Sequence, residues 1–70
     1  MNSEEAMSMF RFSVISPLLA GDDEMSLKKR MYEQASKIWT LPDGRSRQFS
    51  WGTIEDWLYK YRNFGLKGLK

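Results

Sequence analysis

The chain has 70 residues, of which 41% are hydrophobic, 14% aromatic and 29% charged, and it contains neither cysteine nor histidine. A chain of this length forms one small domain, because it buries only about 60% of the surface that its unfolded state exposes. The missing residue types exclude disulfide bonds, zinc fingers, thiolate nucleophiles and imidazole bases. We therefore expect a single globular domain, residues 1–70, that has no cofactor, metal or small-molecule substrate and is not an enzyme.

Charge is distributed unevenly along the chain. Residues 1–26 carry one basic and five acidic side chains, a net charge of −4, and residues 27–70 carry ten basic and four acidic side chains, a net charge of +6. This asymmetry indicates that the C-terminal two thirds meets a polyanion, for which duplex DNA is the usual candidate. A basic surface that contacts only solvent is the alternative interpretation.

The sequence predicts neither a membrane segment nor a secretory signal. The longest strongly apolar stretch, residues 14–20, is interrupted by Ser16 and Pro17 and is too short to cross a bilayer. Glu4 and Glu5 differ from the basic start of a secretory signal. We expect a cytosolic protein without a membrane partner.

The first predicted helix begins near Ser3, which suits an N-cap position. Its apolar residues recur at helical spacing: Met7, Phe10 and Val14. Pro17 cannot continue the hydrogen-bond ladder, so we expect the helix to end near Ile15 and a short turn to follow.

The second predicted helix follows Gly21 and an acidic run at residues 22–24, Asp-Asp-Glu. We interpret these carboxylates as helix caps, with Ser26 as the alternative cap, because the ligand spacing and central glycine of a calcium loop are absent. An apolar stripe then indicates an amphipathic helix: Leu27, Met31, Ala35 and Ile38.

The segment before the third helix opens with a Pro-Asp-Gly turn at residues 42–44. In this turn Pro presets φ, Asp bonds locally and Gly accepts the unusual dihedral. Arg45 and Arg47 then alternate with polar residues, so an extended backbone would place both arginines on the same side. The pattern leaves open whether residues 42–49 form a small β-wing or a plain turn.

The third predicted helix has Ser50 as its N-cap, flanked by Phe49 and Ile54 at the positions of a hydrophobic staple. Its spacing predicts a buried stripe rather than a stacking platform for bases: Trp51, Ile54, Trp57, Leu58, Tyr61 and Phe64. The opposite face presents Gly52, Thr53, Asp56, Tyr59, Lys60 and Asn63. Gly65 suits the position after the helix, and residues 66–70 look like the start of a linker.

Three helices with an extended segment before the last predict an all-α, homeodomain-like bundle of the helix-turn-helix class. In such proteins the early residues of the second helix of the motif read the major groove, while nearby basic residues contact phosphates. The candidate base contacts are therefore Thr53, Asp56, Tyr59 and Lys60. The candidate phosphate contacts are Lys37, Arg45, Arg47 and Arg62. Gly52 would let the helix N-terminus, whose amides can bind a phosphate, approach DNA closely.

Two features depart from that motif. The connection at residues 40–49 is longer than the usual turn of about three or four residues. Glu55 and Asp56 bring carboxylates towards phosphates, which is favourable only where one accepts a hydrogen bond from a cytosine amino group.

Three runs of residues resemble a known family: FRFSVISPLL at residues 10–19, LPDGRSRQFS at 41–50 and TIEDWLYKYRNFGLKGL at 53–69. In order and spacing they are similar to the N-terminal helix-turn-helix DNA-binding region of bacterial integrase-like DDE transposases. The resemblance implies recognition of transposon-end DNA, with a separate catalytic domain, self-association through the parent transposase and a place at the bacterial nucleoid. It also implies that the following residues face DNA or lie near it: Ser50, Thr53, Asp56, Tyr59, Lys60, Arg45, Arg47 and Arg62.

An interaction module is the alternative function. A small helical domain of this kind could mediate transposase assembly or dock a partner, with its charged face merely solvated. A contiguous exposed apolar patch would favour that interpretation.

Overall fold

The computed structural model describes residues 3–20 and 24–70. The elements, in chain order, are α1 (Ser3–Ile15), the 3-10 helix η1 (Ser16–Ala20), α2 (Glu24–Ser36), β1 (Trp39–Thr40), β2 (Ser46–Arg47), α3 (Trp51–Phe64) and the 3-10 helix η2 (Gly65–Leu69). The three expected helices are confirmed, and a two-stranded sheet is added to them. Gly21 and the acidic caps expected at residues 22 and 23 lie outside the described residues.

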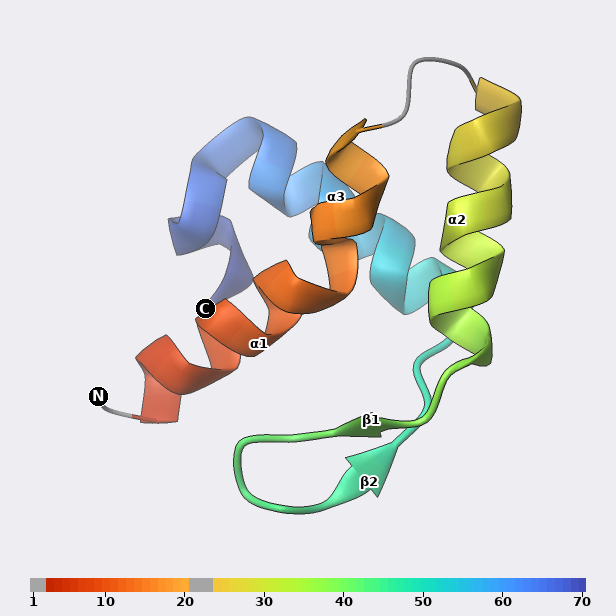
Figure 1. The fold of residues 1–70 in the computed structure, drawn as a ribbon. Coiled ribbons are helices and arrows are strands. Elements are labelled where there is room, and N and C mark those ends of the chain that lie inside the picture. The colour runs from red at the N-terminus through yellow and green to blue at the C-terminus, as the bar shows by residue number, and fades with distance from the viewer. Residues whose placement is uncertain (1–2, 21–23) are drawn as a thin grey trace.

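The helices surround one core, and the hairpin of β1 and β2 extends away from them (Figure 1). In this view α3 passes behind α1, α2 stands along one side, and the C-terminal end returns beside α1. The buried core is made of residues from α1, η1, α2, α3 and η2 and from the segment between α2 and α3: Val14, Ile15, Leu18, Met31, Leu41, Phe49, Ile54, Trp57, Leu58 and Leu69. A buried hydrogen bond of 2.8 Å from Gln34 Nε2 to Val14 O joins α2 to the end of α1.

The first helix ends where Pro17 predicts. Regular α-helix stops at Ile15, and η1 provides the expected short turn, with Leu18 fully buried. Ser3 is the first residue of α1 rather than the residue that precedes it.

The boundaries of α3 follow from its sequence signals. Ser50 has extended backbone dihedrals, and its Oγ accepts a hydrogen bond from the Thr53 N–H at 3.3 Å. Phe49 and Ile54 are both buried, as a hydrophobic staple requires. Gly65 adopts a φ of +68° and donates its N–H to Tyr61 O. This left-handed φ, which favours glycine, ends the helix.

The predicted stripe of α2 is wrong at Ile38. The helix ends at Ser36, and Ile38 lies beyond it with 74% of its surface exposed. The residue that packs against the core is Trp39, because β1 begins there and side chains alternate along a strand instead of repeating every three or four residues. Within α2 itself, Met31 and Gln34 are buried, and Leu27 and Ala35 are half-buried.

The predictions for Phe64 and the C-terminal tail are also wrong. Phe64 is 66% exposed, whereas Leu69 is fully buried. The chain turns at Gly65 into η2, which packs on α1 and brings Leu69 into the core. Residues 65–69 are therefore part of the folded domain and not a linker. The rest of the α3 stripe is correct, with Trp57 and Leu58 buried and Trp51 and Tyr61 half-buried.

Candidate nucleic-acid interface

The segment before α3 forms a β-hairpin. β1 and β2 are antiparallel, with Trp39 opposite Arg47 and Thr40 opposite Ser46. The Pro-Asp-Gly turn closes it: Gly44 donates its N–H to Leu41 O at 2.9 Å and has a φ of +90°, a conformation that favours glycine. The hairpin alternative is thus correct, and a plain turn is excluded.

Asp43 organises the turn in the way that its position predicts. Its Oδ1 accepts the Arg45 N–H at 3.0 Å, and its Oδ2 lies 2.7 Å from Arg45 Nε. The backbone N–H of Arg45 is the largest cause that lowers the pKa of Asp43 below 3.8, and the Arg45 guanidinium lowers it further, while partial desolvation opposes both. Asp43 is therefore a carboxylate at neutral pH and balances part of the charge of Arg45.

Three arginines line one cavity of about 260 Å³. Arg45 and Arg47 from the hairpin line it together, as their alternation along the strand predicts. Arg11 of α1 and Thr53 of α3 line it as well, and apolar side chains complete it: Met7, Leu41, Phe49 and Trp57. None of the described residues that line this cavity is acidic. We call it the arginine cavity.

Two aromatic rings, those of Phe49 and Trp57, line the arginine cavity. The guanidinium carbon of Arg47 lies 5.4 Å from the ring centre of Phe49, and that of Arg11 lies 5.4 Å from the ring centre of Trp57. The two rings contact each other, with their centres 4.8 Å apart. Cation–π contacts of this kind hold a guanidinium over a ring and leave its edge free for other partners.

Arg11 is not among the residues that the sequence predicts to contact DNA, yet it lines the arginine cavity. It is the only basic residue among the first 26, and it lies in an otherwise apolar part of α1. That isolation is the signal that could have identified it. Helical periodicity could not have identified Arg11, because only the tertiary structure brings residue 11 close to residues 45 and 47.

The start of α3 lies beside the arginine cavity. Thr53 is half-buried, and its Oγ1 lies 3.1 Å from Ser50 Oγ. Gly52 is exposed, and apart from its chain neighbours and the nearby helix backbone, no atom of the described residues lies within 4 Å of the position where a Cβ would be. The first turn of α3 is therefore open to a close neighbour.

The other candidate base contacts, Asp56, Tyr59 and Lys60, are exposed, and together they carry no net charge. Asp56 Oδ2 pairs with Lys60 Nζ at 2.9 Å, one helical turn apart. Tyr59 is 64% exposed. The pairing offsets the charge of Asp56, which reduces the repulsion that a carboxylate would otherwise exert on a phosphate.

Two predicted phosphate contacts lie apart from the arginine cavity. Lys37 Nζ lies 5.5 Å from the ring centre of Trp39. Arg62 lines a different cavity between α2 and α3, together with Met31 and Glu55. The structure therefore brings together Arg45, Arg47 and Thr53, and it adds Arg11 in place of Lys37 and Arg62.

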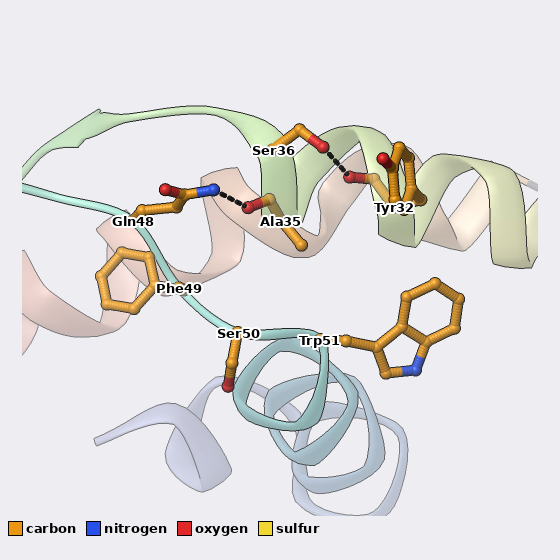
Figure 2. A pocket seen from close by; sticks show the side chains of 7 residues that line it. All are labelled: Tyr32, Ala35, Ser36, Gln48, Phe49, Ser50 and Trp51. Carbon is orange, nitrogen blue, oxygen red and sulfur yellow. Dashed lines mark hydrogen bonds between the residues drawn. The ribbon is translucent and has the colours of Figure 1, made fainter.

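A second cavity, of about 490 Å³, lies between the C-terminal half of α2 and the start of α3 (Figure 2). Gln48 Nε2 donates to Ala35 O at 2.8 Å, and Ser36 Oγ donates to Tyr32 O at 2.8 Å. The rings of Tyr32 and Trp51 lie on the same side of the opening, and the Ser50 hydroxyl points away from it (Figure 2). The donors of Gln48 and Ser36 are thus already used within the protein, and none of the described residues that line the cavity is charged.

Comparisons with protein-family models, with curated proteins and with solved structures found no match to this chain. Within residues 3–20 and 24–70, no helix is both long and apolar enough to cross a membrane. The same residues contain no group of three or more side chains arranged to hold a metal ion.

Proposed function

We propose that this chain binds double-stranded DNA. Arg45 and Arg47 contact phosphates from the hairpin, and the exposed residues at the start of α3 approach the base edges. The observation that carries the proposal is that three arginines line one cavity together with Thr53 of the first turn of α3, and that none of the described residues lining this cavity is acidic. Such a surface suits a polyanion, and a helix start can enter the major groove.

We further propose that the helices act as a variant helix-turn-helix. α2 and α3 are joined by a hairpin and not by a tight turn, so the hairpin serves as a small wing that contacts the DNA backbone next to α3. Thr53, Asp56 and Tyr59 are then the residues that contact bases. Gly52 and Ser50 allow the start of α3 to lie close to the duplex.

The resemblance of residues 10–19, 41–50 and 53–69 to integrase-like DDE transposases supports a more specific proposal. The DNA would be the end of a mobile element, bound in the bacterial cytoplasm on behalf of a separate catalytic domain. Protein–DNA contacts to phosphate would supply affinity, and contacts to bases would supply the choice of site.

Titration of a labelled random-sequence duplex at several salt concentrations, followed by fluorescence anisotropy, tests DNA binding. We expect the logarithm of affinity to fall linearly with the logarithm of salt. The double variant Arg45→Ala/Arg47→Ala should bind every duplex more weakly and reduce the salt slope by about 2. The matched control is Lys29→Ala/Lys70→Ala, which removes two exposed cations outside the arginine cavity.

Two results would overturn this assignment. Absence of binding at low salt would exclude DNA as the partner, and equal salt slopes for both double variants would exclude the hairpin as the phosphate contact. Selection of preferred sites from a random library with Thr53→Val and Tyr59→Phe tests base contact, because only base-contacting residues should change the selected sequence.

A second candidate function is assembly with another protein chain. Three large apolar side chains favour it because they are strongly exposed: Met25, Ile38 and Phe64. Sedimentation at micromolar concentration distinguishes the two functions, since self-association without DNA binding would favour assembly.

A further inference from the structure

The three arginines of the arginine cavity differ in how firmly they are held. Arg11 Nη1 donates to Leu69 O at 2.7 Å, and its guanidinium lies over the buried ring of Trp57. Arg45 and Arg47 are on the exposed hairpin, and Arg45 is bound to Asp43. Arg11 is therefore fixed to the helical core, whereas the other two arginines depend on the hairpin for their position.

Each guanidinium retains donors that face no protein acceptor. Within the described part of the chain, Nη1 is the only nitrogen of Arg11 with a hydrogen-bond partner, and Nε is buried without one. Nη2 is therefore the nitrogen of Arg11 that remains for a ligand. Arg47 has no side-chain hydrogen bond or ion pair there, and Arg45 uses only Nε for Asp43. A guanidinium presents its donors in a planar fork that matches two oxygens of a phosphate. The unused donors thus call for a tetrahedral or planar oxyanion.

The surroundings of these donors strengthen their attraction for an anion. Phe49 and Trp57 are both buried and apolar, so water screens the half-buried Arg11 guanidinium, which lies over Trp57, less than it would on an open surface. Thr53 adds a hydroxyl at the edge of the cavity, from the first turn of α3. The positive end of the α3 helix dipole lies at that turn and also attracts an anion.

We propose that the arginine cavity is a seat for one phosphate group, with Arg11 as its fixed ligand and Arg45 and Arg47 as ligands that close from the hairpin. This inference rests on the proposed function for its biological ligand, a phosphate of DNA. The group is either an internal phosphodiester or a phosphate monoester at a strand end. Because Arg11 is held by the core, the seated phosphate fixes where the start of α3 lies along the duplex.

Inorganic phosphate tests the seat without DNA. In an NMR titration at low ionic strength, we expect saturable shifts of the Nε–H signals of Arg11, Arg45 and Arg47 and of the Trp57 indole N–H. The Nε–H of Arg30 is the internal control, because Arg30 is also a half-buried arginine with one buried unbonded nitrogen but does not line this cavity. Shifts that do not saturate, or that are equal at Arg30, would overturn the seat.

Arg11→Met tests the same ligand with DNA, since it keeps the stem over Trp57 but removes the charge. We expect about tenfold weaker binding, in line with loss of one charge-assisted hydrogen-bonding group, and a salt slope smaller by about 1. Arg30→Met is the matched control and should bind as the unaltered chain does. Thermal unfolding of both variants verifies that they are folded at the temperature of the assay.

Two duplexes of one sequence, with 5′-phosphate or with 5′-hydroxyl ends, identify the source of the phosphate. A terminal monoester predicts tighter binding of the phosphorylated duplex by the unaltered chain and no such difference in Arg11→Met. An internal phosphodiester predicts equal binding of both duplexes and an equal loss in Arg11→Met.

If DNA binds but Arg11→Met behaves as Arg30→Met does, the seat is wrong and the proposed function stands. If phosphate binds the cavity but DNA does not bind the chain, the seat stands and the proposed function is wrong.

Discussion

Arg11 and Leu69 are 58 positions apart in the sequence and are joined by a hydrogen bond of 2.7 Å from Arg11 Nη1 to Leu69 O. A second bond of 3.1 Å, from Ser8 Oγ to Leu66 O, runs beside it. Together they fasten η2 to α1, and through Arg11 they connect the C-terminal segment to the arginine cavity. The packing of the last residues therefore influences the surface that we propose to bind DNA.

Truncation of Leu69 should destabilise the domain strongly. The side chain is fully buried, so Leu69→Ala should lower the free energy of unfolding by about 2–5 kcal/mol. Leu66→Ala is the control within the same 3-10 helix, because Leu66 is 45% exposed, and it should cost less than about 1 kcal/mol. Urea unfolding measures both. Equal losses would show that η2 does not pack as described.

Replacing Gly68 and Gly52 by alanine should change the free energy of unfolding in opposite directions. A Cβ at Gly68 would lie 2.5 Å from Lys60 O, a backbone atom, so Gly68→Ala should destabilise by about 1–3 kcal/mol. A Cβ at Gly52 would meet nothing within 4 Å, so Gly52→Ala should stabilise α3 by about 0.5–1 kcal/mol. Thermal unfolding of the two variants checks the signs. A stabilised Gly52→Ala that binds DNA less well would agree with a close approach of the first turn to the duplex.

Neutralising Asp43 should strengthen DNA binding. Asp43→Asn keeps an oxygen that can accept the Arg45 N–H, and it removes the negative charge beside the Arg45 guanidinium. We expect about fivefold tighter binding at low salt, because a charge that repels phosphate is removed, and a smaller gain as salt screens the interaction. Anisotropy titration at two salt concentrations measures the change. Weaker binding would mean that the Asp43 pair positions Arg45 for the DNA.

The carboxyl group of Asp43 should titrate below its ordinary pKa of 3.8. Because the pKa is lowered in the folded protein, the stabilisation by ionised Asp43 is complete above pH 3.8 and is lost as the pH falls through the lowered value. The backbone N–H of Arg45 is the largest cause and survives in Arg45→Ala, so the pKa of Asp43 should stay below 3.8 in that variant, although by less than in the unaltered chain. An NMR titration of the carboxyl carbon measures it. A pKa that returns to 3.8 in Arg45→Ala would assign the shift to the guanidinium instead.

Local signals in the sequence account for the ends of the elements. Pro17 ends α1, Ser50 begins α3, and Gly65 ends it, because each acts through its own backbone dihedrals or through hydrogen bonds that span only a few residues. The turn at residues 42–44 belongs to the same class. These features could be predicted because the atoms that decide them are neighbours in the chain.

The failures in the prediction share a different cause. Periodicity assigned Ile38 and Phe64 to the core, but each lies at or beyond the end of its helix, where the direction of the side chain changes. Their places are taken by Trp39, whose ring contacts that of Phe10 in α1, and by Leu69, which η2 brings against α1. No helical pattern carries that information.

The sequence by itself determined the helical class, the end of α1, both limits of α3, the turn at residues 42–44 and the alternation that puts Arg45 and Arg47 on one side. Only the tertiary structure decided that Arg11 joins them, that Arg62 and Lys37 lie elsewhere, and that the C-terminal residues complete the core. The physical reason is the range of the interactions. Dihedral preferences and capping act over a few residues, whereas a shared cavity or core is created when segments far apart in the chain exclude water between them.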